Sequence, residues 1–125
     1  MKNLFFFSIA AFLISCSANA QKPTKDDVTR SLKADWEKAA TSLSPKKTVT
    51  VNDIKFGTSE KSNYAQQLEG VPKGALITNA KIDFTENTFY DKETQHTRRI
   101  MTAWVYKNAF GEWAIMNTYI SYPGN

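Results

Sequence analysis

The 125-residue chain contains a single cysteine, Cys16, directly after an apolar stretch near the start of the sequence. One cysteine forms no intramolecular disulfide, and it does not build the multi-thiolate sites that hold structural zinc. Because Cys16 lies within the N-terminal signal region, no thiolate nucleophile is expected in the mature fold. A small domain without disulfides depends on its hydrophobic core for stability.

Patterns that carry common chemistries are also absent. The five glycines are scattered, so there is no glycine-rich phosphate loop, and no Gly-x-Ser-x-Gly nucleophile motif occurs. His96 is the only histidine, which argues against a zinc site. The net charge of +4 is spread along the chain without a basic stripe, which argues against nucleic-acid binding. We therefore expect a non-catalytic protein with no cofactor and no metal.

No stretch reaches 18 apolar residues, so no transmembrane helix is predicted. What is present is an uncharged, apolar stretch at 4–15 that follows the basic residue Lys2. A basic head, a short apolar stretch and a small-residue cleavage region are typical of a secretory signal peptide. We expect residues 1–20 to be a signal peptide and residues 21–125 to form a single domain.

Two cleavage positions lie within FLISCSANAQ, residues 12–21. The segment ANA at 18–20 satisfies the small-x-small rule, and cleavage after Ala20 predicts a periplasmic or secreted protein. The segment LISC resembles a lipobox, and cleavage before Cys16 would give a lipoprotein anchored to the membrane through that residue. We favour cleavage after Ala20.

A short polar lead, QKPTKDD at 21–27, is followed by a segment with the periodicity of an amphipathic helix. Its apolar residues recur three or four positions apart, on one helical face: Val28, Leu32, Trp36, Ala39 and Leu43. Thr24 is a suitable N-cap, Asp26 and Asp27 suit the first turn, and Ser44-Pro45 ends the helix. The sequence predicts one helix over residues 24–44.

The period then changes to two, which is typical of strands. Val49 and Val51 alternate with polar residues, and the next apolar pair, Ile54 and Phe56, is one position out of phase. A β-bulge at Asn52-Asp53 would restore a common face. A helical turn within 58–70 and a β-turn at 71–74 follow.

Three further strands are predicted at 75–90, 95–107 and 112–122, with turns at 91–94 and 108–111 between them. We expect an α+β fold in which one N-terminal amphipathic helix packs on a curved four-stranded antiparallel sheet.

A four-residue loop at 108–111 would place Lys107 opposite Glu112 and set the register of the last hairpin. On this register the large aromatic residues share one face: Trp104, Tyr106, Trp113 and Tyr119. We assign this aromatic face, pointing away from the helix or into a pocket beside it, as a surface that binds a protein or a small molecule. The alternative is that these residues are core, packed on Trp36 and Leu32. A homodimer through the same face stays open.

Carboxylates near the tip of the second predicted hairpin are Glu86, Asp91 and Glu93. Together with His96 they allow an acid–base pair, and two of them with Asn87 allow a weak calcium site. Hairpin tips are normally polar and solvated, so we assign neither function. Asp83 is expected on the solvent-facing side of its strand.

Two short segments resemble known families. QQLEG at 66–70 lies between the first two predicted strands and resembles the Gln-x-Val-x-Gly loop of cystatins, although NAFG stands where cystatins carry Pro-Trp. GEWAI at 111–115 resembles the start of the final strand in many NTF2-like domains. In layout the chain is similar to both α+β architectures, and fold alone does not fix function.

Three functions remain open. We expect an exported bacterial envelope protein that acts as a non-catalytic binding module through the aromatic face. One alternative, implied by the cystatin resemblance, is an inhibitor or immunity-type protein that blocks another protein's active site with QQLEG and NAFG. The other is a small NTF2-like enzyme with a pocket between helix and sheet, using His96 or Asp83.

Overall fold

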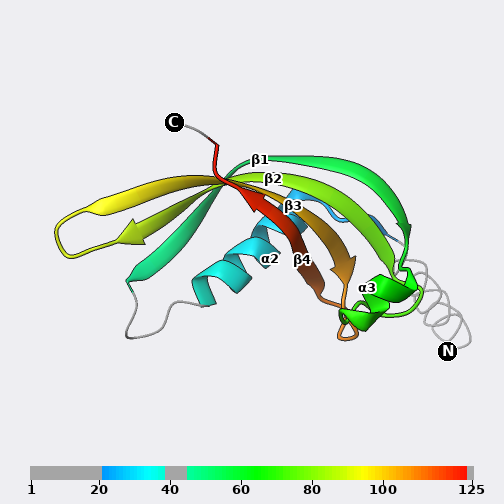
Figure 1. The fold of residues 1–125 in the computed structure, drawn as a ribbon. Helices are drawn as coiled ribbons and strands as arrows, with labels where there is room; N and C mark the ends of the chain where they lie inside the picture. Colours follow the sequence, from blue (N-terminus) through cyan, green and yellow to red (C-terminus); the bar gives the residue numbers. More distant parts are fainter. Residues whose placement is uncertain (1–20, 39–44, 124–125) are drawn as a thin grey trace, which may run out of the picture.

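The computed structural model describes residues 21–38 and 45–123. Its elements are, in chain order, α2 (Lys25–Lys38), β1 (Lys46–Lys61), α3 (Tyr64–Leu68), β2 (Leu76–Phe89), β3 (Thr94–Lys107) and β4 (Trp113–Ser121). The strands form one open antiparallel sheet in the order β1-β2-β3-β4, which arches over α2 (Figure 1). The predicted α+β fold of a helix on a four-stranded antiparallel sheet is confirmed.

Some predictions lie outside the described residues. These are the signal peptide at 1–20 and the part of the predicted helix at 39–44. Within the described ranges, neither helix is long and apolar enough to cross a membrane.

Helix α2 begins with two reciprocal hydrogen bonds. The Asp27 N–H donates to Thr24 Oγ1 at 3.1 Å, and the Thr24 N–H donates to the Asp27 carboxylate at 2.9 Å. This arrangement is a capping box with aspartate at its third position, and it satisfies backbone donors that the helix leaves unpaired. The N-cap predicted at Thr24 is confirmed. Arg30 adds an ion pair to Asp27 at 2.9 Å.

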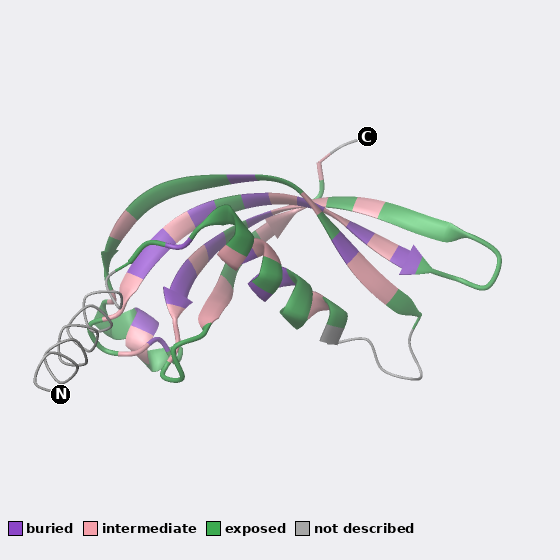
Figure 2. Cartoon of the chain, turned by 180° about the vertical axis from the view of Figure 1, so that it is seen from behind, coloured by how far each residue is buried: buried purple, intermediate pink, exposed green. Residues whose placement is uncertain are grey.

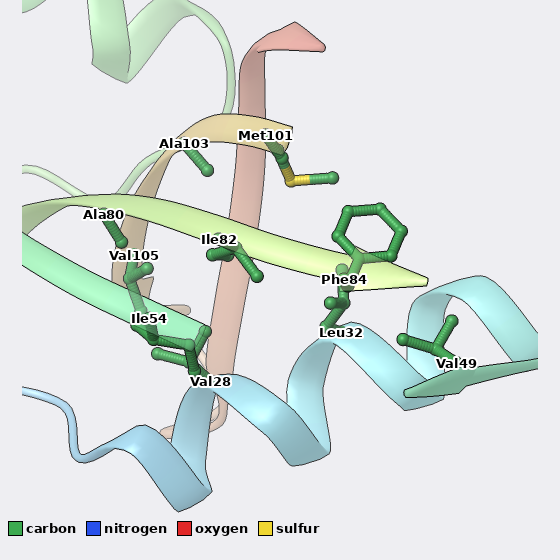
Figure 3. Packing of buried hydrophobic residues seen from close by; sticks show 10 residues of the cluster. All are labelled: Val28, Leu32, Val49, Ile54, Ala80, Ile82, Phe84, Met101, Ala103 and Val105. Carbon is green, nitrogen blue, oxygen red and sulfur yellow. The ribbon is translucent and has the colours of Figure 1, made fainter. Parts of the chain in front are cut away.

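The main core lies between α2 and the sheet (Figure 3). Val28 and Leu32 of α2 are buried against the following strand residues: Val49, Ile54, Ala80, Ile82, Phe84, Met101, Ala103 and Val105. Half-buried Trp36 packs edge-on against Phe84, with ring centroids 5.1 Å apart. Because strand side chains alternate between faces, every second residue of β2 and β3 points toward α2. We call this side the helix face and the opposite side the outer face.

Strand β1 contains two register shifts, one between Val51 and Asp53 and one between Phe56 and Ser59. The first confirms the predicted bulge: Val51 packs against the main core with Val49 and Ile54, whereas Phe56 is 38% exposed. Bulges bend a strand, and β1 follows the arch of the sheet in Figure 1.

The connection at 62–75 leads from β1 to β2 and contains α3. The Asn63 side chain accepts from the Gln66 N–H at 2.9 Å, and the Gln66 side chain accepts from the Asn63 N–H at 2.8 Å. The predicted helical turn is therefore present, with Gln66 buried. The β-turn lies one residue later than predicted, because the Ala75 N–H donates to the Pro72 carbonyl at 3.2 Å. Gly74 supplies the positive φ of 79° that this turn requires.

A second apolar cluster lies on the outer face, under the 62–75 connection. Val71, Ile77 and Tyr106 are its buried members, and its half-buried members are Ala75, Trp104, Ala114 and Met116. Figure 2 shows the buried residues concentrated in the middle strands, whereas the turn between β2 and β3 is exposed.

Candidate functional site

The last hairpin differs from its predicted register by one residue. Lys107 pairs with Trp113, not with Glu112, because the loop contains residues 108–112. The Asn108 N–H donates to the Glu112 carbonyl at 2.8 Å, while the Asn108 side chain accepts from the N–H groups of Phe110 and Glu112 at 2.9 and 3.0 Å. These bonds keep Glu112 in the loop, so β4 begins at Trp113, one residue later than predicted.

This shift separates the four predicted binding aromatics. Residues that pair across antiparallel strands share a face, so Trp113 joins the helix face and packs against the main core. Tyr106, only 8% exposed, and half-buried Trp104 lie on the outer face with the second cluster. Tyr119 pairs with Thr102 on the outer face and is 65% exposed.

The prediction of one continuous aromatic face is therefore wrong, because Trp113 faces α2 and the other three face away. The alternative, that these residues are core packed on Trp36 and Leu32, holds in part: Trp113 packs on the main core that contains Leu32, and the others do not. Trp104 and Tyr106 pack in the cluster of Val71 and Ile77, on the side of the sheet that α2 does not cover.

The residues around His96 do not form the acid–base pair that the sequence allowed and to which we assigned no function. His96 Nδ1 lies 2.6 Å from the Asn87 side-chain oxygen, and the Asn87 amide also donates to Thr48 and Thr50. Glu86 lies on the opposite face of β2, so its predicted place beside His96 is wrong. Across residues 21–38 and 45–123, no three acidic, histidine or cysteine side chains gather as metal ligands.

Asp83 lies on the outer face, opposite its neighbours Ile82 and Phe84, as predicted. Its carboxylate is held by Arg98 in an ion pair and accepts from the Asn52 side chain at 3.2 Å. The hydrogen bond from Arg98 holds the pKa of Asp83 below its usual value, against a smaller opposing effect of burial. An ionised and paired carboxylate is poorly suited to act as a general acid.

The helix face holds a buried ion cluster that the sequence reasoning missed. Glu86 is 4% exposed, and its carboxylate accepts from the Trp36 indole N–H at 2.6 Å. Lys47 Nζ lies 3.2 Å from one carboxylate oxygen, and Arg99 Nε lies 3.1 Å from the other. The contact of Arg99 Nε is an ion pair whose geometry is not that of a hydrogen bond. The Arg99 guanidinium also bonds the Tyr122 hydroxyl and lies 4.7 Å from the centroid of that ring.

Opposing effects act on the pKa of Glu86. Burial raises it, but hydrogen bonds from Trp36 and Lys47 and the charges of Arg99 and Lys47 outweigh burial, so the pKa lies below its usual value. Glu86 is therefore ionised at neutral pH and ties α2 to three strands. A signal for this cluster was present, since Glu86 is in phase with the buried residues Ile82 and Phe84 along β2.

A cavity of about 570 Å³ opens at the end of the sheet where the chain's polar lead, the 62–75 connection and the β3–β4 loop meet. We call it the loop-end cavity. Its lining residues are Gln21, Pro72, Lys73, Gly74, Ala75, Leu76, Lys107, Asn108, Ala109, Phe110, Gly111 and Trp113. The Lys107 ammonium lies 5.2 Å from the centroid of the Trp113 ring. Lys73 and Lys107 are charged, and none of the described lining residues is acidic.

Comparison with known proteins assigns no function to the ion cluster or to the loop-end cavity. The similarity to cystatin-like and NTF2-like domains stays a prediction that rests on the QQLEG and GEWAI segments and on the layout. The chain was compared with protein-family models, with curated proteins and with solved structures, and none of these comparisons found a match.

Proposed function

We propose that this protein is an exported, non-catalytic binding module that holds an acidic segment of a partner protein at the loop-end cavity. The observation that carries this proposal is the lining of the cavity, which combines Lys73 and Lys107 with Trp113 and has no acidic member among the described residues. Lysine ammonium groups attract carboxylates, and tryptophan provides a large contact area at low entropic cost.

Exposed apolar side chains near the cavity support a protein partner. Phe110 at the cavity is 86% exposed, and in α3 Tyr64 and Leu68 are 75% and 70% exposed. Figures 1 and 2 both place α3 and the β3–β4 loop at the same end of the molecule. Large apolar residues that gather at a surface and surround a polar site are typical of protein-binding surfaces.

The state of the charged groups supports a role without catalysis. Glu86 and Asp83 are both held ionised by basic partners. His96 contacts an amide oxygen instead of a carboxylate. Of the four aromatic residues predicted to bind a partner, Trp113 lines the cavity. Tyr119 is exposed on the outer face and stays a second candidate for contact with a partner.

Export is the part of the proposal that rests on sequence alone. The segment 1–20 has the pattern of a signal peptide, with Cys16 as the alternative lipid attachment point. The first described helix begins at Lys25, beyond both cleavage positions. Either cleavage would therefore leave the described elements in the mature chain.

Site-specific photo-crosslinking in the native envelope tests the proposal. A photoreactive phenylalanine analogue replaces Phe110 at the cavity or, as the matched control, Tyr90, which is exposed directly after the last residue of β2, at the opposite end of the sheet. We expect one partner to crosslink from position 110 and not from position 90. Lys73→Glu with Lys107→Glu should abolish that crosslink, and Lys33→Glu on α2 should leave it unchanged. A partner that crosslinks equally in the Lys73/Lys107 variant contradicts the proposal.

A second function, inhibition of an exported hydrolase, is favoured by one observation. Parts of the connection that contains QQLEG and of the loop that contains NAFG line the same cavity, so both predicted inhibitory segments lie at one end of the sheet. In QQLEG, Leu68 is exposed, whereas Gln66 is buried in its capping interaction. This function predicts that the partner crosslinked at position 110 is a hydrolase whose activity falls in the complex.

A further inference from the structure

The polar lead is held against the fold where α2 begins. Pro23 is buried, and Thr24 forms the capping box with Asp27. Proline has a fixed backbone torsion φ, and the residue before it, Lys22, is restricted to extended conformations. These restraints fix the path of the chain close to Gln21. In Figure 1 the lead, drawn in blue, runs from α2 toward the end of the sheet that carries α3.

Gln21 is an exposed residue that lines the loop-end cavity together with Lys73 and Lys107. The predicted cleavage after Ala20 would make Gln21 the first residue of the mature chain. Before cleavage its backbone nitrogen belongs to an uncharged peptide bond, and after cleavage the same nitrogen is an α-amino group. An α-amino group is mostly protonated at neutral pH. Cleavage would therefore add a positive charge beside the two lysines of the cavity.

We propose that cleavage after Ala20 completes the loop-end cavity as a cationic site, in which the α-ammonium group of Gln21 binds the acidic partner segment together with Lys73 and Lys107. This inference rests on the proposed function, because it names a third group for the same site. The three cations come from the lead, the 62–75 connection and the end of β3. None of the described lining residues is acidic, so none of them neutralises the added charge.

The added charge makes binding depend on processing. In the uncleaved precursor, and in a lipoprotein cleaved before Cys16, the nitrogen of Gln21 stays in a peptide bond and has no charge. The chain therefore binds an acidic partner more weakly before cleavage than after it. Only cleavage after Ala20 creates the third cation, so a mature chain that carries acyl groups on Cys16 overturns the inference.

The side chain of Gln21 allows the new charge to be removed without changing any other residue. In an N-terminal glutamine the α-amino nitrogen can attack the side-chain amide carbon. The bond between that carbon and the amide nitrogen breaks, and the amide nitrogen leaves as ammonia with a proton from the amine. The product is a pyroglutamate ring, a neutral lactam, and no oxidation or reduction occurs. Glutaminyl cyclase catalyses this step, and the loss of ammonia from the intact mass reports its extent.

Binding of an acidic probe by the purified, processed chain tests the inference. The probe is a fluorescent peptide of glutamate residues with both ends blocked, and its anisotropy gives the dissociation constant. Cyclisation of Gln21 should raise this constant about threefold, because one exposed ion pair is lost. Added salt should reduce the difference, since it screens exposed charges. In Gln21→Ala, the matched control, there is no amide to cyclise, so cyclase treatment should not change the dissociation constant.

A second measurement tests the position of the α-amino group without any partner. A short bifunctional amine reagent, followed by peptide mass spectrometry, should link Gln21 to Lys73 or Lys107. The absence of both links, or equal affinity for the probe before and after cyclisation, overturns the inference. The proposed function survives either result if Lys73→Glu with Lys107→Glu still abolishes binding of the probe. A natural chain that does not bind the probe contradicts the proposed function and overturns the inference with it.

Discussion

Trp36 donates its indole N–H to the Glu86 carboxylate across 2.6 Å, and this bond joins α2 to β2 at a buried charge. The same carboxylate forms ion pairs with both Arg99 and Lys47. Removing one member of a buried ion cluster leaves the other charges without a partner, which costs more than the intact cluster contributes. We therefore expect the Glu86 cluster to be sensitive to a single substitution.

We expect Glu86→Ala to lower the free energy of unfolding by about 3–5 kcal/mol, because it leaves Arg99, whose side chain is only 17% exposed, without an opposite charge. Asp83→Ala is the matched control, since its partner Arg98 is largely exposed, and it should cost less than about 1 kcal/mol. Urea unfolding followed by tryptophan fluorescence measures both values. Equal losses of unfolding free energy in the two variants would show that the Glu86 cluster contributes no more to stability than the Asp83–Arg98 pair.

The stability of the fold should fall in acid, and Glu86 should carry part of this fall. Its pKa in the folded chain lies below the ordinary value of 4.5, so the unfolded chain binds this proton more readily. The stabilisation is present above pH 4.5 and is lost as the pH falls through the folded pKa. Asp27 behaves likewise, since hydrogen bonds from Thr24 and the Arg30 charge lower its pKa against the opposing effect of burial.

Urea midpoints measured between about pH 7 and pH 2 test this dependence. Glu86→Gln should lower the urea midpoint at neutral pH and weaken its dependence on pH below 4.5. The reason is that a carboxyl group with a lowered pKa in the folded chain is removed. Asp91→Asn, which changes an exposed carboxylate in the turn between β2 and β3, should leave the curve as it is. If the urea midpoint of Glu86→Gln falls in acid as steeply as that of the natural chain, Glu86 does not contribute to the acid sensitivity.

The tyrosines provide a matched pair that separates core from surface. Tyr106→Ala should lower the free energy of unfolding by about 3–5 kcal/mol, because it opens a cavity beneath the 62–75 connection. Tyr64→Ala in α3 should stay within about 0.5 kcal/mol, because its side chain is exposed. Thermal unfolding followed by circular dichroism measures both. A small loss for Tyr106→Ala would mean that the second cluster contributes little.

Local chemistry explains which parts of the fold the sequence predicted. The cap at Thr24 needs only a hydroxyl and an aspartate three residues later, and the bulge near Asn52 follows from a change of phase within one strand. The last hairpin was shifted because the Asn108 side chain extends the loop to Glu112. In a strand, a shift of one residue moves every side chain to the other face, which is why Trp113 was misplaced.

The candidate site was less predictable, because it depends on segments that are distant in the sequence. Lys73 lies shortly before β2 and Lys107 is the last residue of β3, and the two line one cavity only because these strands are neighbours in the sheet. Glu86 was assigned to the exposed tip because carboxylates usually face water. Its phase along β2 would have placed it inside, and Arg99 is in phase with buried Met101 in the same way.

The β3–β4 loop should depend on the Asn108 side chain, which accepts two backbone N–H groups. Asn108→Ala leaves these donors without their acceptor, and we expect a loss of about 1 kcal/mol in stability. The larger effect should be on binding, since the loop positions Phe110 at the cavity. The crosslink from position 110 should weaken in Asn108→Ala while the fold persists. Asn79→Ala, which removes an amide from β2, is the control and should keep the crosslink.

Cleavage of the N-terminal segment should be decided by ANA at 18–20 and not by Cys16. We expect the intact mass of the mature protein to match a chain that starts at Gln21, without added acyl groups. Cys16→Ser should then leave both the mass and the location unchanged, because the residue is removed with the signal peptide. Ala20→Leu is the contrasting variant, since a large residue before the cut should slow processing and leave a heavier precursor. A mass increased by acyl chains, and lost in Cys16→Ser, would instead establish a lipoprotein whose tether places the fold near the membrane surface.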